Sequence, residues 1–124
     1  MLFGTTSAGG VHSFGTAFAL ELPAMPGNPW GFAVIQSFDL TDGSAPSALT
    51  LGGGNTLWGT AGDGGNGIVF QLSYSGGSWT ETVLYRLFSR AGPGYGAILY
   101  KNALYSATPT GGYKNNGTVF QLSY

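Results

Sequence analysis

The segment that decides the fold is Gly67-Ile68-Val69-Phe70-Gln71-Leu72-Ser73-Tyr74, which returns as Gly117-Thr118-Val119-Phe120-Gln121-Leu122-Ser123-Tyr124. A more divergent copy lies earlier, at Gly15-Thr16-Ala17-Phe18-Ala19-Leu20. In the last copy, side chains of different chemistry alternate with a period of two, which is typical of a β-strand. The chain therefore contains the same predicted strand three times, at intervals of about 50 residues.

Three further segments repeat around this strand in a fixed order. A short segment with an aromatic residue at its second position precedes each copy, and a Gly-rich loop follows that segment: Leu2–Thr6, Leu57–Ala61 and Leu104–Thr108. A longer segment that begins with Trp occurs twice, as Trp30–Phe38 and Trp79–Phe88. After a turn with Gly and Pro, it is followed by a short apolar run: Ala48–Leu51 and Ala97–Tyr100.

Each period thus holds four strand-sized segments. In the last full period we expect them at Thr80–Phe88, Gly96–Tyr100, Leu104–Thr108 and Gly117–Ser123, with a turn at Lys101-Asn102. Four short antiparallel strands in about 50 residues are typical of a propeller blade. The sequence therefore predicts an all-β fold of propeller-like tandem repeats with almost no helix. A β-solenoid and a β-sandwich remain as alternatives.

The period divides the chain, as a single repeat domain spanning 1–124, into a partial repeat 1–28 and two repeats, 29–74 and 75–124. This division gives about two and a half repeats, with about ten strands in total. A propeller closes only with at least about four blades. An open end also leaves an unpaired strand edge, which proteins normally protect. We therefore expect either a fragment of a longer array or one protomer of a ring. A compact stand-alone sandwich is the third option.

These motifs resemble the GloVer-type tandem repeats of bacterial secreted or surface-anchored proteins. The matching segments are Leu2–Thr6, Trp79–Phe88 and Asn116–Leu122, and the likeness extends over nearly the whole chain. The chain departs from the repeat at Ser106 (Gly expected), at Ala19 (a polar residue expected) and in the long connection Glu21–Asn28. The resemblance implies an extracellular repeat scaffold without enzymatic activity, with an export signal outside this sequence.

Composition excludes several classes of function. Charged residues make up only 7% of the chain and the formal net charge is −1, so nothing predicts binding to nucleic acid. The chain has no cysteine, which removes disulfides and thiolate chemistry. Its apolar residues come in short runs, so no membrane-spanning segment is predicted. Aromatic residues at 15% are too frequent for a disordered chain.

No residue pattern predicts a catalytic site. His12 is the only histidine, and it lies in a Gly-rich loop without the strained elbow of a hydrolase. Asp39 and Asp42 fit turn chemistry better than calcium binding. The segment 62–67 matches G-x-G-x-x-G, but a strand rather than a helix is expected to follow it, so we interpret it as a turn. We therefore expect neither an enzyme nor a cofactor or metal.

The repeated aromatic residues carry the remaining functional hypothesis. Phe18, Phe70 and Phe120 lie in mid-strand among apolar residues, so we assign them to the core. A second set of repeated aromatic residues precedes the Gly-rich loops: Phe3, Trp58 and Tyr105. A ring at this position could stack on a sugar beside polar loop residues, or it could pack between blades instead. The candidate ligand-binding residues are Trp58, Asp63, Asn66, Tyr105, Tyr113 and Asn115.

We therefore expect a secreted or cell-surface module that acts as a scaffold or interaction platform. The alternative is a lectin-like propeller with one weak carbohydrate site per repeat. The expected partners are a glycan or a protein, or further copies of the chain that complete a propeller as a homo-oligomer.

Overall fold

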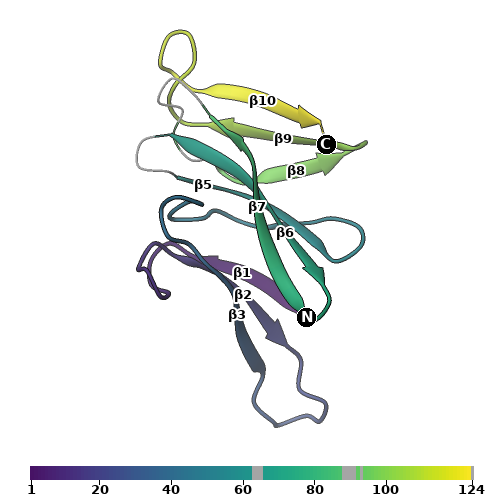
Figure 1. Cartoon of the computed structure of the whole chain (residues 1–124). Helices are drawn as coiled ribbons and strands as arrows, with labels where there is room; N and C mark the ends of the chain where they lie inside the picture. Colours follow the sequence, from purple (N-terminus) through teal and green to yellow (C-terminus); the bar gives the residue numbers. More distant parts are fainter. Residues whose placement is uncertain (63–65, 88–91, 93, 124) are drawn as a thin grey trace.

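A computed structural model describes residues 1–62, 66–87, 92 and 94–123. The described chain forms ten β-strands and no helix, which confirms the all-β prediction. The strands form three small antiparallel sheets, none of them closed, that lie one above the other (Figure 1). The first sheet contains β1 (Leu2–Thr6), β2 (Thr16–Glu21) and β3 (Gly31–Ser37). The middle sheet contains β4 (Thr50–Leu51), β5 (Thr56–Gly62), β6 (Gly67–Ser75) and β7 (Ser78–Arg86). The third contains β8 (Ala97–Tyr100), β9 (Ala103–Thr108) and β10 (Thr118–Ser123).

Two-residue turns join consecutive strands in the middle and third sheets, whereas the two connections of the first sheet are longer. Gly76 and Gly77 join β6 to β7 with φ angles of +61° and +87°. Lys101 and Asn102, the predicted turn, join β8 to β9 with φ angles of +46° and +63°. Two central residues with positive φ make a turn whose twist matches that of an antiparallel strand pair. Such turns oblige the flanking strands to pair with each other.

The sheets divide the chain differently from the sequence period. The repeat borders at 28/29 and 74/75 fall inside the first and middle sheets, because β3 and β7 pair with the strands before them. The two-residue turn between β6 and β7 enforces the pairing of these two strands. The connection from β7 to β8 is long enough to cross to the next sheet. Within the described residues, only the middle sheet has four strands, in the order β4-β5-β6-β7.

Backbone geometry nevertheless repeats from the first sheet to the middle one. A β-bulge shifts the pairing of β2 with β3 between Ala17 and Phe18, and that of β6 with β7 between Val69 and Phe70. The amide of Phe38 donates to the carbonyl of Gly15 at 3.0 Å, and that of Leu87 donates to the carbonyl of Gly67 at 2.8 Å. Leu87 is therefore the structural equivalent of Phe38. The sequence comparison matched Phe38 with Phe88, which lies outside the described residues.

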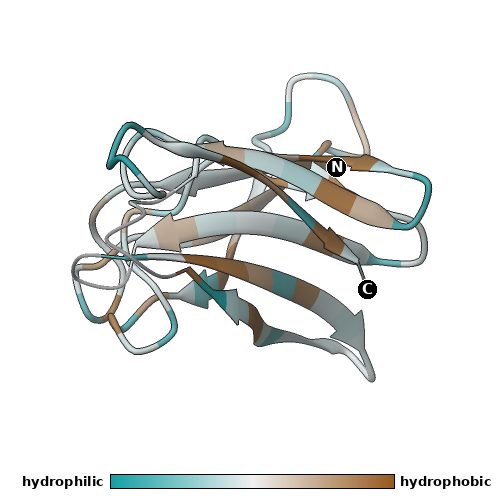
Figure 2. Cartoon of the chain, turned by 90° about the horizontal axis from the view of Figure 1, so that it is seen from above, coloured by the Kyte–Doolittle hydropathy of each residue, from teal (hydrophilic) through white to brown (hydrophobic). Residues whose placement is uncertain are grey.

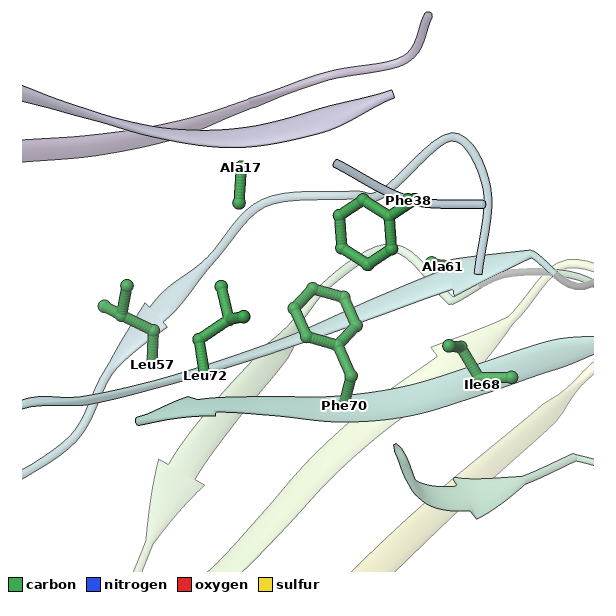
Figure 3. Packing of buried hydrophobic residues seen from close by; sticks show 7 residues of the cluster. All are labelled: Ala17, Phe38, Leu57, Ala61, Ile68, Phe70 and Leu72. Carbon is green, nitrogen blue, oxygen red and sulfur yellow. The ribbon is translucent and has the colours of Figure 1, made fainter. Parts of the chain in front are cut away.

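The larger hydrophobic core lies between the first and middle sheets (Figure 3). Phe38 and Phe70 are fully buried and meet edge to face, with their ring centroids 5.1 Å apart. The Phe70 ring also covers Gly59 on the neighbouring strand, where an added Cβ would lie 2.5 Å from the ring. The other buried members of this core are Ala17, Leu57, Ala61, Ile68 and Leu72.

A second core lies between the middle and third sheets. Trp58 and Val69 from the middle sheet contact Ala97 and Leu104 from the third. Since neighbouring residues of a strand point to opposite faces, β5 and β6 supply both cores at once. The most hydrophobic residues, coloured brown, accordingly lie mainly along the strands, and several loops at the strand ends are hydrophilic (Figure 2). The middle sheet is thus covered on both faces.

The three repeated phenylalanines differ in burial: Phe18 is half-buried outside both cores, so its assignment to the core was wrong, and Phe70 and Phe120 should differ in energetic weight. Phe70 is fully buried, whereas Phe120 lies on the edge strand β10, half-buried against the second core. We expect Phe70→Ala to lower the free energy of unfolding by about 3–5 kcal/mol, as for a buried aromatic side chain, and Phe120→Ala to cost less than about 3 kcal/mol. Urea denaturation measures both, and a loss under about 1 kcal/mol for Phe70→Ala would contradict its place in the core.

Candidate functional site

Trp58, the first candidate ligand residue, lies inside the protein. Its side chain is only 4% exposed and forms part of the core between the middle and third sheets. The ring lies over Gly52, where an added Cβ would come within 1.7 Å of it. A sugar has no free ring face to stack on here. Of the two interpretations of Trp58, its burial favours packing between sheets.

The other candidate residues are dispersed rather than gathered. Tyr105 is half-buried on the outer face of the third sheet, where Gln121 is its partner on β10. Tyr113 is fully exposed in the loop between β9 and β10. Asn115 has a structural role in the same loop, because its Oδ1 accepts a hydrogen bond from the Gly111 amide at 3.1 Å. Asn66 is half-buried just before β6, and Asp63 lies outside the described residues.

The structure instead contains a groove of about 550 Å³ between the first and middle sheets. Neither the groove nor most of its residues were predicted from the sequence. From the first sheet and the chain start, it is lined by Met1, Phe3, Ala19, Ala33, Val34 and Ile35. From the middle sheet and its turns, it is lined by Leu51, Gly52, Asn55, Thr56, Leu57, Tyr74 and Trp79.

Side-chain size explains why the groove opens between these two sheets. The first sheet presents Phe3 and Ala19 toward the groove, a cross-strand pair on β1 and β2. The equivalent pair in the middle sheet is Trp58 and Gln71, two larger side chains that face the third sheet. The smaller pair, Phe3 and Ala19, leaves a groove between the first and middle sheets. Trp58 and Gln71 fill the corresponding space between the middle and third sheets. The departure of Ala19 from the repeat pattern was therefore the one sequence signal of this groove.

Aromatic rings form one wall of the groove. The Trp79 ring meets Phe3 edge to face, with centroids 5.7 Å apart, and lies 5.3 Å from the ring of Tyr74. Asn55 and Thr56 supply polar groups on the same side, and Asn55 is held in place by its carbonyl, which accepts from the Tyr74 amide at 3.0 Å. A ring-shaped ligand with one apolar face and several hydroxyl groups matches this lining.

Asp39 and Asp42 form a closed turn. One carboxylate oxygen of Asp39 accepts hydrogen bonds from the amide and hydroxyl of Thr41 and from the Asp42 amide. The Thr41 hydroxyl is the main reason why the pKa of Asp39 falls to about 2. Asp42 accepts from the Asp39 amide at 2.8 Å and from Gln36 Nε2 at 2.6 Å. These bonds support the turn interpretation, and within the described residues no group of three or more His, Asp or Glu could hold a metal ion.

The other motifs also lie in connections between strands. Gly62 ends β5 and Gly67 begins β6, so a strand follows the G-x-G-x-x-G match, as expected for a turn. Residues 63–65 of this motif lie outside the described residues. His12 is exposed in the loop between β1 and β2, as expected.

Glu81 is a carboxylate inside the interface between the first and middle sheets. It lies opposite Leu72 on the inward face of β7, and its Oε1 is buried without a hydrogen-bond partner within the described residues. Burial is the main cause that raises the pKa of Glu81 to about 7, and repulsion from Asp42 adds to it. The attraction of Arg86 opposes this rise. Sequence reasoning gave Glu81 no role.

The raised pKa of Glu81 predicts that stability depends on pH. Between the ordinary value of 4.5 and about 7, the folded chain binds more protons than the unfolded chain. Stability should therefore fall as pH rises through this window, and the loss should be complete above pH 7. We expect Glu81→Gln to remove most of this slope and to raise the melting temperature at pH 8 but not at pH 4.5. A wild-type melting temperature that rises between pH 5 and pH 8 would contradict the assignment.

Comparisons with known proteins identify no relative. No protein-family profile, curated protein or solved structure matches the chain. No helix in the described part of the chain is long and apolar enough to cross a membrane. The function therefore has to be argued from the sheets, the groove and the repeat.

Proposed function

We propose that the chain is a non-enzymatic repeat module that acts as a scaffold or interaction platform, with each sheet serving as one propeller-like blade. One observation carries the proposal: residues at the same position of the repeat make two successive inter-sheet contacts. A module of this kind grows by adding sheets, each of which contacts only its neighbours.

Equivalent residues cover equivalent faces in the two contacts. Leu57, Phe70 and Leu72 of the middle sheet lie in the core shared with the first sheet. Their repeat equivalents in the third sheet are Leu104, Phe120 and Leu122, which lie in the core shared with the middle sheet. In both contacts, the same face of the repeat therefore meets the preceding sheet. This regularity supports a stacked scaffold.

The positions of the polar groups support binding rather than catalysis. His12 lies in an exposed loop, and Asp39 and Asp42 are engaged in the hydrogen bonds of a turn. The propeller-like architecture rests on the four-stranded middle sheet and the stacking of its neighbours. A secreted or cell-surface location in a bacterium belongs to the same proposal and rests on the GloVer-type resemblance alone.

Equivalent leucines provide the test. Leu57 and Leu104 are 1% and 0% exposed, whereas Leu2, at the same repeat position, is 57% exposed. We expect Leu57→Ala and Leu104→Ala to lower the free energy of unfolding by about 2–5 kcal/mol each, and Leu2→Ala by less than about 1 kcal/mol, all measured at a dilution where the chain is monomeric. Both inner variants should keep a single cooperative transition in urea. Separate transitions for the two inter-sheet cores would show that the sheets do not form one stack.

Carbohydrate binding is the second candidate function, and the groove favours it. Trp79 and Tyr74 offer aromatic faces beside Asn55 and Thr56, as sugar recognition requires. A single carbohydrate site in this groove differs from the expectation of one weak site in every repeat. The matching contact between the middle and third sheets holds the Trp58 ring instead of a groove.

Tryptophan fluorescence tests this second function. We expect a panel of neutral mono- and disaccharides to contain at least one that shifts the tryptophan emission of the chain in a saturable way. Tyr74→Ala should weaken that binding about tenfold, because a ring contact contributes about 0.5–1.5 kcal/mol beyond the area that it buries. Tyr113→Ala is the matched control in an exposed loop. Binding that is lost with Tyr113→Ala but kept with Tyr74→Ala would place the site in the loop.

A further inference from the structure

The outer face of the first sheet is apolar. Leu2, Leu20 and Phe32 are cross-strand partners and form one row across β1, β2 and β3. Phe18 and Val34 form a second row, and the Phe18 and Phe32 rings lie 5.6 Å apart. Phe32 is 64% exposed and Leu2 57% exposed. We call these five residues the leading face.

The outer face of the third sheet is apolar as well. Ile98 and Tyr105 are partners across β8 and β9, and Val119 extends the surface onto β10. Ile98 is 68% exposed, Tyr100 58% and Val119 85%. We call Ile98, Tyr100, Tyr105 and Val119 the trailing face. Exposed apolar patches of this kind mark interaction sites on soluble proteins.

The repeat shows what covers a leading face elsewhere in the molecule. Phe18 covers Gly4 as Phe70 covers Gly59, with an added Cβ 2.6 Å and 2.5 Å from the two rings. Phe70 is nevertheless fully buried, because its face meets the first sheet. Leu2 and Leu20 likewise match Leu57 and Leu72, which are both buried. The leading face is therefore built for burial under a sheet.

The same argument holds for the trailing face. Tyr105 and Val119 occupy the repeat positions of Trp58 and Val69. The strand partner of the aromatic residue is a glutamine in both sheets: Gln121 pairs with Tyr105, and Gln71 pairs with Trp58. Trp58 and Val69 are buried under the third sheet. The trailing face thus has the chemistry that covers a leading face inside the chain. The two outer faces are complementary to each other rather than to themselves.

We propose that the leading face of one copy of this chain binds the trailing face of a second copy, head to tail. The new contact reproduces the two inter-sheet contacts within the chain. Because the faces differ, the interface is heterologous, and repetition closes a ring when the rotation per copy allows it. Two copies contribute six sheets, within the range of about four to eight blades in closed propellers. The inference rests on the proposed repeat scaffold.

The neutrality of both faces supports a second copy as the occupant. The strand residues that point outward with the leading and trailing faces include no Asp, Glu, Lys or Arg. Apolar faces without charge gain free energy from removal from water and provide no electrostatic selection of a foreign partner. The partner is therefore selected by the complementary shapes of the leading and trailing faces, which follow from the repeat.

Two single-face variants test the proposal on the whole chain. Phe32→Asp blocks the leading face, and Val119→Asp blocks the trailing face, both at exposed positions. Light scattering coupled to size exclusion should give a discrete oligomer for the wild type and a 12.8 kDa monomer for each variant alone. An equimolar mixture should form a 1:1 heterodimer, because each variant keeps the face that the other lacks. Leu2→Asp and Ile98→Asp, also at exposed positions, provide a second pair with the same expectation.

The controls separate this proposal from its alternatives. Tyr113→Asp, at a fully exposed loop position outside both faces, should keep the wild-type mass. Circular dichroism and cooperative urea curves show whether each variant is folded. A wild type that stays monomeric while folded overturns the head-to-tail contact and leaves the stacked scaffold intact. A variant that still associates with itself shows a contact between like faces, and a mixture that stays monomeric overturns the complementarity of the two faces.

Discussion

The structure depends on the burial of both faces of the middle sheet. A strand directs alternate side chains to opposite sides, so β6 can place Phe70 toward the first sheet and Val69 toward the third. Both residues are fully buried. An isolated small sheet cannot bury both of its faces, and single hairpins are at best marginally stable in water. The neighbouring sheets are therefore required for the stability of the middle one.

Glycine leaves room for the repeated aromatic rings of the neighbouring strand. An added Cβ would lie 2.5 Å from the Phe70 ring at Gly59 and 2.6 Å from the Phe18 ring at Gly4. A side chain at Gly59 would therefore displace Phe70 from the core between the first and middle sheets. In the third sheet Ser106 stands at this position, and its hydroxyl donates to the carbonyl of Gly96. Phe120, the residue paired with Ser106, is half-buried on the edge strand β10.

The groove and Glu81 are two exceptions to the regular stack, and both lie between the first and middle sheets. The groove exists because small side chains of the first sheet face a wall that contains Trp79. Glu81 places a carboxylate in this interface, and its burial there is the main reason why its pKa rises to about 7. Local departures from repeat consistency are where function is expected, because regular packing alone does not require them. The outer faces differ from these exceptions, since their residues follow the repeat.

The sequence alone determined the period, the strand-sized segments and the turn at Lys101-Asn102. Alternation along β10 and the pair Lys101-Asn102 are local signals, and local sterics of the backbone suffice to interpret them. Only the tertiary structure decided which strands share a sheet, because the pairing of β3 with β2 depends on connection geometry rather than on the repeat period. It also decided the environments of Phe3, Trp58 and Tyr105, which share one repeat position. The position of each sheet in the stack sets whether such a ring borders a groove, is buried or faces the surface, and no local pattern encodes that position.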